Sequence, residues 1–240
     1  MCRSIAAVTF DLWGTLLDGR YSLWPRRCEM LARYLPSHTS KCVEEAYGES
    51  WRRFSQATDG GFGMRGVTVL SMTLDRLGAT LSPPTYKAVL QGWEEATLQE
   101  PPPFLEGVPD MLYRLRDKGL LIGLISDTGV TPGWVLRRLL RERGLLKAFD
   151  WLTFSDEIGV TKVCAYPFTS TLRVLRVPAE SALHVGDLPE IDLRGARSAG
   201  MHSALVLESS ARRDGIAEAE IVLERICDLP KALSAWEACA

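Results

Sequence analysis

The chain has 240 residues, of which 46% are hydrophobic and 24% are charged, and this composition excludes a largely disordered protein. Lysine and arginine number 28 and aspartate and glutamate number 30, so a net charge of −2 offers no broad basic field for nucleic acid or for a membrane surface. The longest apolar runs, such as 120–125, are too short to span a bilayer. We therefore expect neither nucleic acid nor membrane among the partners.

The six cysteines are irregularly spaced and form no C-x-x-C pair, which argues against a structural zinc site and against a disulfide framework. Free thiols indicate a reducing compartment. Near the N-terminus, Asp11 interrupts the apolar run before it reaches the length of a signal peptide. These features predict a cytoplasmic protein.

Short apolar runs alternate with helical patterns along most of the chain. The runs predicted to be strands are 5–10, 120–125, 149–154, 182–185 and 203–207, with a short additional strand at 220–223. The helical patterns between and after them are 110–118, 132–143, 168–176, 191–199 and 229–238. Continuously apolar strands separated by helices are typical of a parallel sheet covered on both faces. The sequence therefore predicts an α/β fold with a doubly wound parallel sheet, that is, a Rossmann-like core.

One long segment between the first two strands departs from this alternation. It contains four helical patterns, at 23–34, 41–56, 67–77 and 84–96, and no clear strand. Proline runs and a glycine-rich loop punctuate these patterns. We interpret residues 18–100 as an inserted α-helical domain, and residues 1–17 together with 101–240 as the α/β core.

Polar residues stand where the predicted strands end. Asp11 follows the first strand, Ser126 and Asp127 end the second, and Lys162 lies after the third. The fourth is followed by Asp187 within the segment Gly-Asp-Leu-Pro-Glu-Ile-Asp. Because ligands of doubly wound sheets bind at the carboxyl ends of the strands, these side chains are expected to converge on one site.

These four motifs and the position of the helical insertion resemble the haloacid dehalogenase superfamily of hydrolases, in which the insertion corresponds to a mobile cap domain. The resemblance implies that Asp11 is the nucleophile and forms an aspartyl-phosphate that water then hydrolyses. It implies that Ser126, with the backbone N–H groups of Asp127 and Trp13, holds the phosphoryl oxygens. Lys162 would neutralise charge on Asp11 and on the phosphoryl group.

The resemblance also implies a Mg²⁺ cofactor. Asp11, Asp187 and the main-chain carbonyl of Trp13 would hold the cation, since Mg²⁺ prefers a few carboxylates together with water and phosphate. Thr15 and Asp192 are expected behind these direct contacts, with Asp192 orienting a metal-bound water or Lys162. An N-terminal helix carboxylate is the alternative interpretation of Asp192.

The sequence departs from the family pattern in two places. Phosphatases of the family usually carry a second Asp two residues after the nucleophile, which protonates the leaving group, whereas this chain has Trp13. Lys162 is followed by Val-Cys-Ala-Tyr-Pro-Phe instead of the Pro-x-Pro that often follows the lysine. An indole cannot act as an acid, so acyl and aryl phosphates, which leave without protonation, are the substrates expected to suffer least.

Three functions stay open on the sequence. The first is a Mg²⁺-dependent phosphatase acting on a small phosphorylated metabolite. The second is a catalytically weak metal-binding or regulatory protein on the same fold. The third is a metal-independent 2-haloacid dehalogenase, because that branch carries an aromatic residue at the position of Trp13, although its fourth motif lacks the Gly-Asp seen at Asp187. A monomer and a homodimer are both compatible with the sequence.

Two groups of residues are given a structural interpretation. Arginines of the insertion, such as Arg26 and Arg27, are of a type that binds phosphate or carboxylate, but for any single one a solvated face is the simpler interpretation. His184, on the fourth strand, is interpreted as a core residue with satisfied hydrogen bonds rather than a catalyst.

Overall fold

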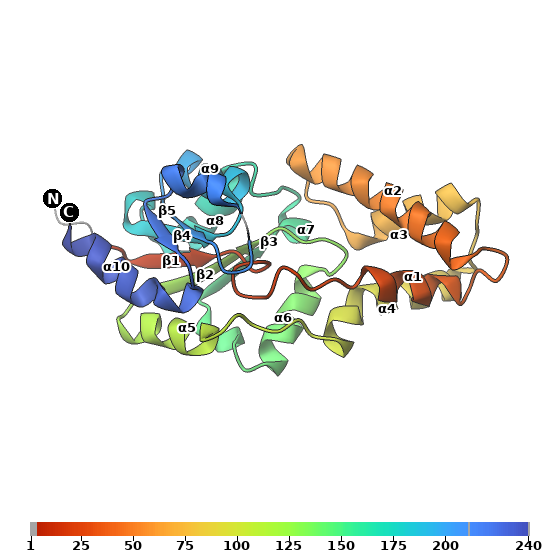
Figure 1. Cartoon of the computed structure of the whole chain (residues 1–240), viewed down its shortest axis with the longest axis horizontal. Helices are drawn as coiled ribbons and strands as arrows, with labels where there is room; N and C mark the ends of the chain where they lie inside the picture. Colours follow the sequence, from red (N-terminus) through yellow and green to blue (C-terminus); the bar gives the residue numbers. More distant parts are fainter. Residues whose placement is uncertain (1–3, 211, 240) are drawn as a thin grey trace.

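A computed structural model describes residues 4–210 and 212–239 and shows a six-stranded parallel sheet flanked by helices (Figure 1). The strand order is β3-β2-β1-β4-β5-β6, and each neighbouring pair runs parallel. The strands are β1 (Ala7–Phe10), β2 (Leu121–Ser126), β3 (Trp151–Phe154), β4 (Ala182–Gly186), β5 (His202–Val206) and β6 (Ile221–Leu223). The predicted α/β fold with a doubly wound parallel sheet is confirmed.

The helices that cover the sheet fall on its two faces. On one face α5 (Val108–Asp117), α6 (Gly133–Glu142) and α10 (Leu229–Ala238) pack on the larger apolar cluster of the core. On the other face α8 (Tyr166–Leu175) and α9 (Arg194–Ser198) pack on a smaller cluster. All residues of β1 and β4 are buried as a result, which is why these central strands are mostly apolar, and the polar side chains of Thr9 and His184 on them bond to each other.

Four helices lie together between β1 and α5, at one end of the molecule (Figure 1). They are α1 (Trp24–Ala32), α2 (Ser40–Asp59), α3 (Gly66–Leu77) and α4 (Pro83–Gln99). Their apolar side chains pack around Tyr47 and Trp93, whose rings meet edge to face at 5.2 Å. The hydroxyls of Thr39 and Ser82 accept hydrogen bonds from backbone N–H groups and begin α2 and α4.

The segments that enter and leave the helical group run side by side. Asp18 N donates to Pro103 O at 3.0 Å, and Leu105 N donates to Leu16 O at 2.9 Å. The group also contacts the loop that precedes Lys162, because Thr161 Oγ1 donates to Thr58 O. We propose residues 18–100 as a cap domain and residues 1–17 with 101–240 as the core domain.

One predicted helix differs from the structure. The pattern at 191–199 predicts a single α-helix, but a π-helical turn at Pro189–Leu193 precedes the short α9. Asp192 lies in that wide turn, where Leu188 N donates to its Oδ2 at 3.0 Å, and its side chain points back into the core. The short helix α7 (Ser155–Ile158) after β3 is an element that the sequence pattern did not predict.

Candidate active site

The carboxyl ends of the central strands bring the predicted site residues together. Because β1 lies between β2 and β4, Asp11 at the end of β1 is flanked by Ser126 of β2 and Asp187 after β4. These three residues are 5%, 1% and 8% exposed. The strand order alone therefore places a carboxylate between a hydroxyl and a second carboxylate.

Lys162 joins this group from the loop after α7. Its Nζ lies 2.5 Å from Asp11 Oδ1 and 2.5 Å from Asp192 Oδ1, in ion pairs that are almost fully buried. The backbone of Lys162 is held as well, because its N–H donates to the Asp127 carboxylate at 3.0 Å. Lys162 is thus fixed at both ends, without the prolines that usually follow the lysine in relatives.

Asp192 is the hydrogen-bonded anchor of the ammonium group. Its Oδ1 accepts from Lys162 and lies 3.2 Å from His184 Nε2. His184 Nδ1 lies 2.9 Å from Thr9 Oγ1, so the imidazole bridges Thr9 and Asp192 inside the core. With Leu188 N on its other oxygen, Asp192 faces Lys162 and has little capacity left for a further ligand.

Burial and neighbouring charge set the ionisation of these groups. Burial raises the pKa of Asp11 to about 7, against the opposing effect of Lys162. Burial and the charges of Asp11 and Asp192 raise the pKa of Asp187 to about 8. Burial disfavours charge on Asp192 too, but its bonds to Lys162 and His184 hold its pKa below the usual range. The pKa of Lys162 is raised, because the surrounding carboxylates outweigh its own burial.

The site has an excess of negative charge that suits a cation. Asp11, Asp187 and Asp192 each offer an oxygen within 4.8 Å of the others, and the Lys162 ammonium pairs with two of these three carboxylates, those of Asp11 and Asp192. Three buried oxygens of the site have no hydrogen-bond partner among the described residues: Asp11 Oδ2, Asp187 Oδ1 and Thr15 Oγ1. Buried polar atoms are rarely left without a partner, so these residues fit a divalent cation with oxygen ligands.

Gly14 makes room for the Asp187 carboxylate. It has a φ of +84°, which favours glycine, and a Cβ added there would collide with the carboxylate oxygens of Asp187. The turn after Asp11 therefore approaches Asp187 more closely than any other residue type would permit at this position.

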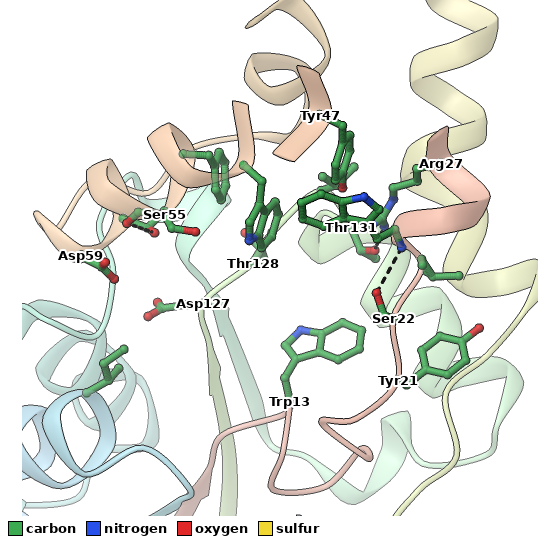
Figure 2. A pocket seen from close by; sticks show the side chains of 18 residues that line it. Trp13, Tyr21, Ser22, Arg27, Tyr47, Ser55, Asp59, Asp127, Thr128 and Thr131 are labelled. Atoms are coloured by element: carbon green, nitrogen blue, oxygen red, sulfur yellow. Dashed lines mark hydrogen bonds between the residues drawn. The ribbon is translucent and has the colours of Figure 1, made fainter. Parts of the chain in front are cut away.

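Trp13 lies in the turn that follows Asp11. Its half-buried side chain packs against the core cluster and lines a cavity of about 360 Å³ between the core and the helical group. Figure 2 shows the indole at the base of this cavity, with Asp127 and Asp59 to one side and Arg27 and Tyr21 to the other. The cavity is within the size range of small-molecule sites.

The structure adds functional contacts that the sequence reasoning missed. The sequence assigned only the backbone N–H of Asp127, whereas its carboxylate fixes the loop of Lys162. His184 is a buried core residue, as interpreted from the sequence, but it also contacts Asp192 and so belongs to the support of the site. Strand-end position was the available signal for Asp127, and no local signal marked His184 as a partner of Asp192.

Comparison with known proteins places the chain in a family. A model of the haloacid dehalogenase-like hydrolases matches residues 5–200. A glyceraldehyde 3-phosphate phosphatase of Methanopyrus kandleri is 27% identical over 199 residues, which cover 82% of this chain and 82% of that protein.

Two solved structures share the fold. A haloacid dehalogenase (HAD) phosphatase from Thermococcus onnurineus has a TM-score of 0.71 at 22% identity and covers 95% of this chain and 98% of that chain. A 2-haloacid dehalogenase from Pseudomonas syringae pv. Tomato DC3000 has a TM-score of 0.69 at 23% identity, with coverage of 97% and 99%. Phosphatase and dehalogenase thus resemble this chain equally well in fold, so the fold does not choose between them. On the match of residues 5–200, the chain belongs to the haloacid dehalogenase-like hydrolases.

Proposed function

We propose that the protein is a Mg²⁺-dependent phosphatase that hydrolyses a small phosphorylated metabolite through an aspartyl-phosphate on Asp11. The observation that carries this proposal is the pair of unpartnered buried oxygens on Asp11 and Asp187, beside an ammonium that already holds the other oxygen of Asp11. The excess of carboxylates supports a cation at this place. The phosphatase relative of Methanopyrus kandleri supports phosphoryl transfer as the reaction class.

In this reaction the Asp11 carboxylate attacks phosphorus, an oxygen–phosphorus bond forms, and the bond from phosphorus to the leaving-group oxygen breaks. Lys162 donates to Asp11, keeps that carboxylate in orientation and balances the phosphoryl charge. The Ser126 hydroxyl, whose contact to Asp127 O is long at 3.3 Å, is available to donate to a phosphoryl oxygen. Water then attacks phosphorus, releases phosphate and regenerates Asp11.

Asp187, Asp11 and the Trp13 carbonyl are the proposed ligands of Mg²⁺. The bound cation supplies charge neutralisation, which allows an anionic carboxylate to approach an anionic phosphate. Asp192 and Thr15 are proposed as neighbours of these ligands that do not bind Mg²⁺ directly. Asp192 orients Lys162, which is the role supported by its bonds to Lys162, His184 and Leu188.

Trp13 limits the substrates of this phosphatase. With an indole where relatives place a proton donor, the leaving group departs as an anion, and the loss for a poor leaving group is about 10²–10⁴-fold. Acyl and aryl phosphates, whose leaving groups are stable anions, are therefore the proposed preferred classes.

Trp13 also supports a second candidate, a metal-binding protein with little turnover. The family's dehalogenase branch, by contrast, needs no cation. The unpartnered Asp187 Oδ1 favours a bound cation and therefore argues against a dehalogenase. One set of assays distinguishes the phosphatase from both the binding protein and the dehalogenase.

The assays measure phosphate release from acetyl phosphate and p-nitrophenyl phosphate, and halide release from 2-chloropropionate, each with Mg²⁺ and with chelator. Asp11→Asn is run beside the wild type. The phosphatase predicts phosphate release that requires both Mg²⁺ and Asp11. Halide release in the presence of chelator would indicate the dehalogenase, and Mg²⁺ binding without either product would indicate the binding protein.

A further inference from the structure

Arg27 is a buried cation that has no carboxylate partner among the residues that the structure describes. Its side chain lies on α1 and is 7% exposed. Its Nε donates to Trp93 O at 3.2 Å, and one terminal nitrogen donates to Thr131 Oγ1 at 2.8 Å. The ionisable groups that act on it most strongly are Tyr47, Tyr21 and Cys28, which are neutral at pH 7. A guanidinium buried among neutral groups is costly unless an anion joins it.

Arg27 lies at the wall of a cavity in which such an anion can bind. Arg27 and Thr131 both line the cavity that Trp13 closes at its base. In Figure 2 Arg27 lies on the side of the cavity opposite Asp127, the residue that follows Ser126 at the proposed phosphate site. An elongated molecule that fills the cavity therefore has one end toward the core and the other toward Arg27.

Aromatic side chains form part of the cavity wall. They are Trp13, Tyr21, Trp24, Tyr47, Trp51 and Phe54. Trp51 and Phe54 are stacked, with centroids 5.4 Å apart. Such a wall favours a planar or apolar middle part of the bound molecule.

We infer that Arg27 binds a carboxylate of the substrate, so that the substrates are phosphate esters with an apolar middle and a carboxylate at the end remote from the phosphate. This inference rests on the proposed phosphatase function for the phosphate end. A carboxylate fits better than a second phosphate, because one guanidinium and nearby hydroxyls balance a single charge.

Arg27 joins α1 to α4 through its backbone as well as through its side chain, because Trp93 Nε1 donates to Arg27 O at 2.9 Å. Thr131 is a positioning residue: its hydroxyl accepts from Arg27 and lies 2.7 Å from Thr97 Oγ1, which fixes the direction of the guanidinium. The Arg27→Met variant keeps the backbone contact, and it removes the positive charge together with the hydrogen bonds to Trp93 O and Thr131 Oγ1.

The test compares a carboxylate with its neutral amide. 3-Phenylpropionate and 3-phenylpropionamide are titrated into the Mg²⁺-loaded protein, and binding is followed by the fluorescence of the tryptophans that line the cavity. We expect the acid to bind the wild type about tenfold or more tightly than the amide. We expect this preference to disappear in Arg27→Met and to persist in Arg26→Met, whose side chain is bonded instead to Glu100 and Gln99. Equal binding of acid and amide to the wild type overturns the inference without any variant, as does a preference that Arg27→Met retains.

A second measurement extends the test to turnover. The ratio of kcat/KM for 4-carboxyphenyl phosphate to that for 4-carbamoylphenyl phosphate should exceed about ten in the wild type and fall to about one in Arg27→Met, through KM. A wild-type ratio near one overturns the substrate class. If neither ester releases phosphate while the acid still binds through Arg27, the proposed phosphatase function fails and the carboxylate site stands.

Discussion

Removal of the Lys162 ammonium is the perturbation whose size the structure sets most clearly. In Lys162→Met the carboxylates of Asp11 and Asp192 lose a partner at 2.5 Å. The side chains of Lys162, Asp11 and Asp192 are 3%, 7% and 0% exposed, so solvent cannot replace the lost positive charge. Breaking a buried ion pair by removing one partner costs about 3–5 kcal/mol. Because the pKa of Lys162 is raised, this stabilisation is fully present below the ordinary lysine value of 10.5 and therefore at neutral pH.

The assay is urea unfolding of the metal-free protein at pH 7, followed by far-ultraviolet circular dichroism. With a denaturant slope of about 2 kcal/mol per molar urea, a loss of 3–5 kcal/mol lowers the midpoint by about 1.5–2.5 M. The matched control is Lys147→Met, an exposed lysine whose loss should change stability by less than about 0.5 kcal/mol. A midpoint of Lys162→Met equal to that of the control would refute the claim that Lys162 neutralises the two carboxylates.

Three further predictions follow from the same contacts. Mg²⁺ at 100 times its Kd should stabilise the wild type by about 2.7 kcal/mol and so raise its Tm, and Asp187→Asn should lose this rise. A rise in the Tm of Asp187→Asn equal to that of the wild type would argue against Asp187 as a ligand. Trp13→Asp should raise kcat/KM for alkyl phosphates more than for p-nitrophenyl phosphate, since it restores a proton donor, and a uniform change across leaving groups would contradict this. Cys28, whose pKa burial raises to about 12, should resist iodoacetamide at pH 8 in the native protein while the exposed Cys42 reacts, as peptide mass spectrometry would measure.

The parts of the fold that the sequence predicts are those governed by local pattern. Strands β1 and β4 are mostly apolar because both their faces are covered, and that pattern is visible without any structure. The positions of the site residues follow from the order of the strands. Because β1 lies between β2 and β4, Asp11, Ser126 and Asp187 at the carboxyl ends of these strands must lie at one edge of the sheet. The match to the family and the shared fold agree with the predicted α/β core.

The contacts that escaped prediction depend on packing between distant segments. The bond from Lys162 N to Asp127 joins residues 35 positions apart, and a strand-end aspartate carries no mark of which loop it holds. The π-helical turn at Pro189–Leu193 turns Asp192 inward, whereas a regular helix was expected. The sequence predicts Arg27 to be a surface arginine, and its burial follows from contacts with distant residues, among them Trp93 and Thr131.

No helix within the described parts of the chain combines the length and the apolar character needed to cross a bilayer. The proposed partner is a small phosphorylated molecule, held between the core and the helices α1 and α2 that line the cavity.

The most direct test of the account is to trap the covalent intermediate on Asp11. The wild type is mixed with p-nitrophenyl phosphate and Mg²⁺, quenched in acid during the first turnovers and reduced with borohydride, which converts an acyl phosphate of aspartate to homoserine. Peptide mass spectrometry then identifies the modified residue. We expect homoserine at position 11 only when substrate and Mg²⁺ are both present. Phosphate release with an unmodified Asp11, or with the modification on another carboxylate, would contradict it.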